Sequence, residues 1–100
     1  MNVTITQTEQ QTQVELNGRI DTISSQEFLD TVEKAFRTEH PEIVINCEGL
    51  EYISSSGLRA WLTLHKTALQ HGGKLILLQL NPQVMEVLQM TGLSSVFTLA

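Results

Sequence analysis

The stretch that decides the fold is EIVINCEGLEYISSSGLRAW, residues 42–61, because it leads from an apolar strand into a helix through small hydroxyl residues. Residues 43–45 are apolar without alternation, which predicts a central strand covered on both faces. The segment 46–53 is expected to be the exit loop of that strand. A helix is predicted over residues 54–71, and Gly72-Gly73 is expected to end it.

Two alternating runs precede this stretch near the start of the chain. Val3 and Ile5 in the first run, and Val14 and Leu16 in the second, fall on one face of a pleat. The polar residues 8–11 lie between the runs. This pattern predicts an opening β-hairpin.

A first helix is expected between the hairpin and the central strand. Ser24 and Glu27 have the spacing of a capping box, and apolar residues then recur at helical intervals. The prediction is a helix over roughly residues 25–38, with Pro41 closing the turn that follows it.

The remainder of the chain repeats the alternation of strand and helix. Residues 75–80 are expected to form a second buried strand. Asn81 before Pro82 is typical of a helix start, and Gly92 of a helix end. Residues 95–99 can add a short last strand. The predicted class is α/β, with a mixed sheet of about four to five strands packed against α-helices.

Length and composition predict one globular domain over residues 1–100, with 41% apolar and 17% charged residues. The net charge of −5 comes without a cluster of lysines and arginines, which argues against nucleic acid and favours a protein partner. No apolar run is long enough to span a membrane, and the polar start lacks a signal-peptide pattern, so a cytoplasmic location is expected. Cys47 is the only cysteine and is predicted to be a packed thiol.

Enzymatic, metal-dependent and cofactor-dependent chemistry is not expected from the motifs. The three histidines lack metal-ligand spacing, and the usual phosphate-binding glycine loops are absent. Ser55-Ser56-Gly57 is reminiscent of a hydrolase nucleophile elbow, but Ile53 stands where the first glycine of that motif is required. The motifs therefore give no support for hydrolysis, for a metal site or for a nucleotide pocket built on the usual phosphate loops.

The predicted helix over residues 54–71 is amphipathic. A helical wheel places six residues on its core side: Leu58, Trp61, Leu62, His65, Ala68 and Leu69. Ser55, Arg59 and Lys66 fall together at the polar border, so the Ser55 hydroxyl is expected to be accessible. On local sequence alone, Ser54 and Ser55 could equally serve only as caps of the helix.

Four sequence blocks, in this order, resemble the STAS family of anti-sigma-factor antagonists. They are Gly18-Arg19-Ile20-Asp21, Asn46-Cys47-Glu48-Gly49-Leu50, Ile53-Ser54-Ser55-Ser56-Gly57-Leu58-Arg59 and Met90-Thr91-Gly92-Leu93. Together with the elements between them, the blocks cover nearly the whole chain. The resemblance implies the STAS fold.

The resemblance also implies a function, a site and partners. In that family the serine two positions before the glycine accepts phosphate from a partner kinase, and this position is Ser55 here. Asp21 is carried over as a residue close to the phosphorylation site, and Ser54, Ser56, Gly57 and Arg59 as its surroundings or partner surface. The implied partners are an anti-sigma factor that is itself a serine kinase, and a protein serine phosphatase.

One position departs from the family pattern. Many members have Asp immediately before the phosphorylated serine, whereas this chain has Ser54. The substitution removes a negative charge and leaves three consecutive serines as candidate acceptors. It also keeps an alternative open, in which the domain is a non-phosphorylated scaffold or sensor module of a larger signalling complex.

Overall fold

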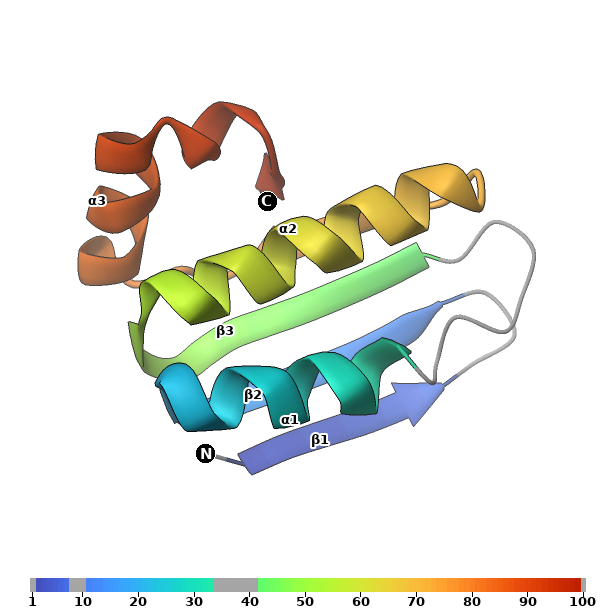
Figure 1. The fold of residues 1–100 in the computed structure, drawn as a ribbon, viewed down its shortest axis with the longest axis horizontal. Helices are drawn as coiled ribbons and strands as arrows, with labels where there is room; N and C mark the ends of the chain where they lie inside the picture. The colour runs from blue at the N-terminus through green and yellow to red at the C-terminus, as the bar shows by residue number, and fades with distance from the viewer. Residues whose placement is uncertain (1, 8–10, 34–41, 100) are drawn as a thin grey trace.

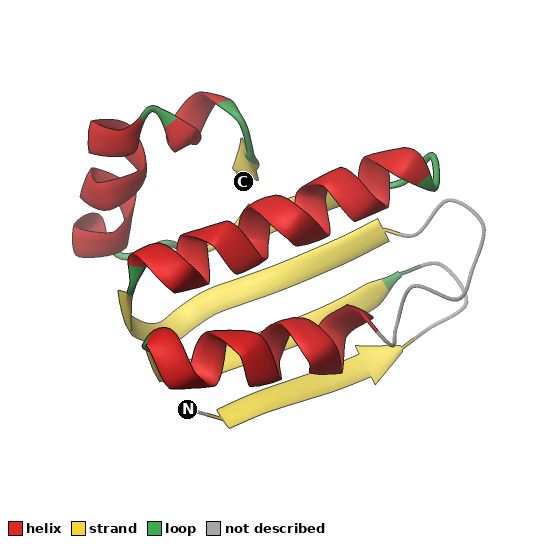
Figure 2. Cartoon of the chain, viewed as in Figure 1, coloured by secondary structure: helices red, strands yellow, loops and turns green. Residues whose placement is uncertain are grey.

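A computed structural model describes residues 2–7, 11–33 and 42–99 of the chain. Figure 1 shows helices α1 and α2 side by side over one face of a β-sheet, and Figure 2 shows the same view by secondary structure. The elements are β1 Asn2–Gln7, β2 Thr12–Ile20, α1 Thr22–Glu33, β3 Glu42–Ile53, α2 Ser55–Gln70, β4 Lys74–Leu78, α3 Pro82–Thr91, a 3-10 turn Leu93–Ser95, and β5 Thr98–Leu99.

The sheet has five strands in the order β1-β2-β3-β4-β5. β1 pairs with β2 in antiparallel register, and each of the other neighbouring pairs is parallel. The predicted opening hairpin and the mixed α/β class are thus confirmed. Residues 8–10 of the predicted hairpin turn, and residues 34–41 with the predicted end of the first helix, lie outside the described residues.

Strand β3 is longer than predicted, because residues 46–53 continue the strand instead of forming an exit loop. They pair with the second half of β2, across two shifts of register. Gly49 permits this close approach, since a Cβ atom at that position would meet the Asn17 side chain. Pairing over this length carries β3 as far as Ile53, directly before the three serines.

Residues 43–45 are all buried, as predicted for a central strand, and helices α1 and α2 lie over one of its two faces (Figure 1). Ile43 and Ile45 are fully buried in the core cluster. Val44 points to the opposite face, where it lines a shallow depression with Ile76 and Leu78. Side chains along β3 therefore alternate between the two faces of the sheet, and Val44 keeps little exposed area on the face without α1 and α2.

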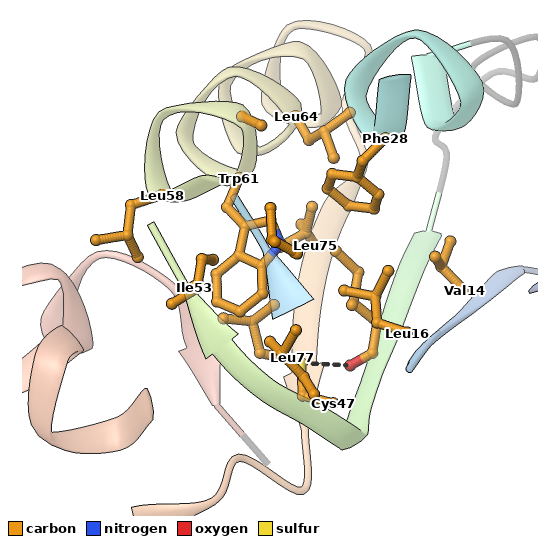
Figure 3. Close-up of a cluster of buried hydrophobic side chains, with 14 of the residues drawn as sticks. Val14, Leu16, Phe28, Cys47, Ile53, Leu58, Trp61, Leu64, Leu75 and Leu77 are labelled. Carbon is orange, nitrogen blue, oxygen red and sulfur yellow. Dashed lines mark hydrogen bonds between the residues drawn. The ribbon is translucent and has the colours of Figure 1, made fainter. Parts of the chain in front are cut away.

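The core lies between the helix layer and the sheet. Figure 3 shows Trp61 of α2 and Phe28 of α1 pointing from their helices toward the strands. Both side chains are fully buried, and Phe97 packs edge-on against the Trp61 indole with ring centroids 6.1 Å apart. Because the largest core residue comes from α2, packing fixes the position of that helix on the sheet.

The wheel for α2 predicts part of its core side correctly. Trp61, Ala68 and Leu58 are buried, and His65 is half-buried against the Phe97 ring. Leu69, however, is 56% exposed, whereas Leu64 is fully buried. The buried face of α2 is therefore turned away from Leu69 and toward Leu64.

Cys47 is a packed thiol, as predicted. It is fully buried on β3, and its Sγ donates a weak hydrogen bond to the Ile45 carbonyl oxygen at 3.7 Å. Burial raises the pKa of this thiol to about 12. The thiolate is not formed at neutral pH, so Cys47 is an inert part of the core.

Helix α3 begins and ends as the sequence predicts. The Asn81 side chain accepts a hydrogen bond from the Val84 backbone N–H at 2.8 Å and donates one to the Leu50 carbonyl at 2.7 Å. Pro82 is the first helical residue, and Gly92 ends the helix with φ of 78°. Asn81 therefore caps α3 and ties it to β3.

Candidate functional site

Two helix starts meet at one edge of the sheet. β2 ends at Ile20 and leads into α1, and β3 ends at Ile53 and leads into α2. Ile20 and Ile53 are paired in the parallel register, and the Ser54 backbone N–H donates to the Ile20 carbonyl at 2.8 Å. The N-termini of α1 and α2 are consequently neighbours, which brings the two distant sequence blocks around Asp21 and Ser55 together.

Ser54 is the N-cap of α2. Its backbone is extended, with φ of −81° and ψ of 169°, and its side-chain oxygen accepts from the Gly57 backbone N–H at 3.1 Å. The residue is half-buried. This hydroxyl satisfies a backbone donor that would otherwise be free, which is the ordinary role of a serine at this position.

Ser55 and Ser56 occupy different environments although they are consecutive. Ser55 is the first residue of α2 and is exposed, and no hydrogen bond to its side chain is found within the described residues. Ser56 is half-buried and faces the groove between α1 and α2. The predicted accessibility of Ser55 is confirmed, and the caps-only reading now applies to Ser54. Phosphorylation of Ser55 stays a prediction.

Gly57 allows α2 to start close against the sheet. A Cβ atom on this residue would lie 2.7 Å from Cγ2 of Ile20 and 2.7 Å from Cγ1 of Ile53. Both are atoms of stiff β-branched side chains near the backbone, so neither can move aside cheaply. Gly57 was predicted among the site surroundings, and it contributes through packing because it is buried.

Asp21 is the N-cap of α1, which corrects the predicted capping box of Ser24 with Glu27. One Asp21 carboxylate oxygen accepts from the backbone N–H of Ser24 at 2.9 Å and of Ile23 at 3.1 Å. In return, the Asp21 backbone N–H donates to the Ser24 hydroxyl oxygen at 2.9 Å. Glu27 is an exposed residue on the second turn of the helix.

The Asp21 carboxylate is stabilised in its charged form. The pKa of this carboxyl is lowered by the hydrogen bond from the Ser24 backbone N–H, then by one from the Ser24 hydroxyl, and also by the Ile23 backbone N–H. The side chain is exposed, and its hydrogen-bonded oxygen is committed to the helix start. Asp21 follows Ile20, whose carbonyl accepts from the Ser54 backbone N–H, but the observed contacts of its carboxylate are those of a cap.

Arg59 lies on the exposed side of α2, four residues after Ser55. It lines an open groove of about 330 Å³ between the two helices. The other residues that line this groove are Thr22, Ser25, Gln26, Leu29, Ser56, Ala60 and Thr63. Hydroxyl groups and one guanidinium dominate this lining, and no carboxylate contributes to it.

A cation–π pair beside the site was not predicted. The Arg19 guanidinium lies 4.5 Å from the centroid of the Tyr52 ring. These residues are opposite each other in the β2–β3 register, one position before the Ile20 and Ile53 pair. The exposed Tyr52 ring and the highly exposed Ile23 add apolar area near the two helix starts. Only the strand register could have revealed the pair, since the two residues are distant in sequence.

Two bacterial anti-sigma factor antagonists are similar to this chain in sequence. The anti-sigma F factor antagonist of Paenibacillus polymyxa is 32% identical over 81 residues, which are 80% of this chain and 69% of that protein. BtrV of Bordetella bronchiseptica is 41% identical over 58 residues, which are 58% of this chain and 50% of BtrV. The alignment with BtrV thus spans half the length of that relative.

Solved structures share the fold. The anti-sigma factor antagonist SpoIIAA in its unphosphorylated form superimposes with a TM-score of 0.85 at 25% identity, over 99% of this chain and 88% of that one. The Bacillus cell fate determinant SpoIIAA in the phosphorylated form gives a TM-score of 0.76 at 22% identity, over 99% and 91% of the two chains.

A family model described as the STAS domain matches residues 2–100. That range contains every element of the described fold, and both helix starts of the candidate site lie within it. The chain belongs to the STAS domain family.

Proposed function

We propose that this chain is an anti-sigma factor antagonist whose binding to an anti-sigma factor is switched by phosphorylation of Ser55. The proposal rests on the different environments of the three consecutive serines. Ser54 is committed to capping α2, Ser56 faces a groove, and Ser55 is exposed at the first helical position. An accessible hydroxyl that the fold does not use is the group that a kinase can modify without unfolding the domain.

The chemistry requires a partner enzyme. The anti-sigma factor, acting as a serine kinase, transfers the terminal phosphoryl group of ATP to Ser55 Oγ, with loss of the hydroxyl proton and release of ADP. A serine phosphatase reverses the change by adding water to the phosphoserine, which releases inorganic phosphate. The chain itself performs no catalysis in this scheme. Both partner enzymes and the sigma factor belong in the cytoplasm with ATP and RNA polymerase.

The switch follows from electrostatics and hydration. A phosphate adds about −1.5 to −2 charge to a surface that has to lose water when a partner docks. The start of α2 can hold this charge without damage to the fold, because unpaired backbone N–H groups and the positive end of the helix dipole lie there. The first turn of α2 also contains no acidic residue. Phosphorylation therefore opposes docking more than it opposes folding.

One feature favours a second candidate function, a scaffold or sensor module that is never phosphorylated. Ser54, where many family members have Asp, leaves the acceptor without its usual acidic neighbour. Under this alternative the same exposed surface would bind a partner without modification.

In the part of the chain that the structure describes, no helix is long and apolar enough to cross a membrane.

Incubation of the folded protein with a candidate anti-sigma factor and ATP tests the proposal. Intact mass should show the gain of one phosphoryl group, and peptide mapping should place it on Ser55. Ser55→Ala should abolish the gain, whereas the matched variant Ser56→Ala should retain it. Full phosphorylation of the Ser55→Ala protein would show that the acceptor is another residue. Absence of phosphorylation with every candidate kinase would favour the scaffold function.

A further inference from the structure

Arg59 lies where a phosphate on Ser55 would be within reach of its guanidinium. The two residues are at positions i and i+4 of α2, and both are exposed. Residues with this spacing are neighbours on a helix surface, about 5–6 Å apart between their Cβ atoms. A helical side chain also covers the surface on the N-terminal side of its own Cα, so Arg59 extends toward the turn that contains Ser55.

The Arg59 guanidinium is not held by an acidic partner in the described parts of the chain. The ion pair identified there joins Lys74 to Glu42. Asp30 on the facing helix accepts from the Gln26 side chain at 2.9 Å, and Asp21 is engaged at the start of α1. Neither carboxylate lines the groove that Arg59 faces. The guanidinium is thus available to a new anion.

The other cations near or on α2 are less suited to this role. Arg19 is stacked over the Tyr52 ring across the strands β2 and β3. Lys66 shares the exposed side of α2 but lies eleven residues beyond Ser55, about 16 Å along the helix axis. That separation exceeds a Debye length of about 10 Å at 0.1 M salt. Arg59 is therefore the cation that spacing and availability single out.

We infer that the Arg59 guanidinium binds the phosphate carried by Ser55, as an i to i+4 pair on the surface of α2. This inference rests on the proposed function, because it needs Ser55 to be phosphorylated. The order along the helix, with the anion N-terminal to the cation, is the favourable one for such pairs. Guanidinium can also donate two parallel hydrogen bonds to phosphate oxygens, which lysine cannot do in the same planar geometry.

The pair has a regulatory consequence. Before modification, Arg59 presents a positive group beside the Ser55 hydroxyl, on the surface that a partner would meet. After modification, the same group is drawn to the phosphate, so the positive charge offered to an acidic partner is lost together with the gain of negative charge. One modification would then change two features of the surface, and a phosphatase would have to displace Arg59 before hydrolysis.

The test uses protein with phosphoserine installed at position 55 during translation, so that no kinase is needed. Phosphorus NMR follows the titration of the phosphate in otherwise wild-type protein and in Arg59→Gln, Arg59→Lys and Lys66→Gln. Arg59→Gln should move the midpoint to higher pH by about 0.3, a twofold change expected for an exposed helical ion pair. Lys66→Gln removes the same charge and should leave the midpoint within about 0.1. Arg59→Lys should fall between these values.

Two results would overturn the role of Arg59. Equal midpoints in wild type and Arg59→Gln would show that the guanidinium does not contact the phosphate. Equal shifts of the titration midpoint in Arg59→Gln and Lys66→Gln would show that the phosphate responds only to the overall charge of the protein and not to contact with Arg59. Circular dichroism of each unphosphorylated variant checks that the exposed substitutions leave the fold unchanged. A kinase that fails to modify Ser55 would count against the proposed function, and it would not alter this titration.

Discussion

The starts of α1 and α2 lie side by side at the same edge of the sheet, yet they are built differently. The first is capped by the charged side chain of Asp21, which accepts from two backbone N–H groups. The second is capped by the neutral hydroxyl of Ser54, and the exposed Ser55 follows it. The cap of α1 thus carries a negative charge and the cap of α2 is neutral, while neither helix has an acidic residue in its first turn. This difference supports the proposal that a phosphate is added at the start of α2.

The largest expected effect comes from Gly57, which has no counterpart at the start of α1. Gly57→Ala should lower the free energy of unfolding by about 2–3 kcal/mol, because the new methyl group would clash with Ile20 and Ile53. This result runs against helix propensity alone, which favours Ala over Gly by about 1 kcal/mol. Denaturation by urea measures the change. Ser56→Ala in the same turn is the control and should stay within about 0.5 kcal/mol of wild type.

If Gly57→Ala were neutral or stabilising, the close contact of α2 with the strand ends would not be a requirement of the fold. The two helix starts would then not differ in packing, and the charge of their caps would be the remaining difference between them.

The second prediction concerns charge at Ser55 and depends on the proposed function. Ser55→Asp should weaken binding to the anti-sigma factor by about 2 kcal/mol, roughly 30-fold, because a charge must lose water on docking. Ser55→Ala should bind about as well as wild type, since the Ser54 hydroxyl and not that of Ser55 provides the cap of α2. Calorimetric titration of both folded variants measures the two affinities. Equal affinities would contradict the charge switch, and weaker binding by the Ala variant would reverse it.

Much of the fold could be predicted from local sequence, because the relevant signals are local. The hairpin runs, the cap at Asn81 and the stop at Gly92 all depend on residues close in the chain, and the structure confirms them. The continuation of β3 through residues 46–53 could not be predicted in this way. It depends on pairing with a distant strand and on the contact between Gly49 and Asn17.

In the candidate site, too, some features could be predicted from the local sequence and others could not. Exposure of Ser55 follows from the amphipathic pattern of α2, and it was predicted correctly. The capping role of Asp21 was missed because Ser24 and Glu27 have the same spacing as a capping box. Sequence spacing alone does not say which of two overlapping patterns wins. The strand end at Ile20 decides it, since it leaves Asp21 as the residue between β2 and α1.

The third prediction tests the neutral cap. Ser54→Ala removes the acceptor of the Gly57 backbone N–H, and it should cost about 1 kcal/mol in free energy of unfolding. Ser54→Asp should restore the cap, because carboxylates are good acceptors at this position, and it would also give α2 the charge that α1 already has. Urea denaturation at neutral pH compares the three proteins. A Ser54→Ala variant as stable as wild type would mean that the 3.1 Å hydrogen bond contributes nothing.

The smallest expected effect is the pH dependence of the charged cap, and it distinguishes the two helix starts most directly. Hydrogen bonds hold the pKa of Asp21 below its ordinary value of 3.8. The folded protein therefore binds a proton at this group less readily than the unfolded chain does. The resulting stabilisation is fully present above pH 3.8, and it is lost as pH falls from there through the lower pKa of the folded state. Asp21→Asn keeps an oxygen acceptor for the cap and removes this titration.

Wild type and Asp21→Asn should therefore differ in stability by a constant amount near neutral pH, and the difference should change only as pH falls below 3.8. Thermal unfolding of both proteins at a series of pH values measures this, with Ser54→Ala as the matched control at the other helix start. The Ser54→Ala difference should be the same at every pH, since no titrating group is removed. A difference between wild type and Asp21→Asn that is flat down to the lowest pH would mean that the Asp21 charge adds nothing to its hydrogen bonds. The two helix starts would then be equivalent caps, and the capacity of α2 to accept a phosphate would have to come from exposure alone.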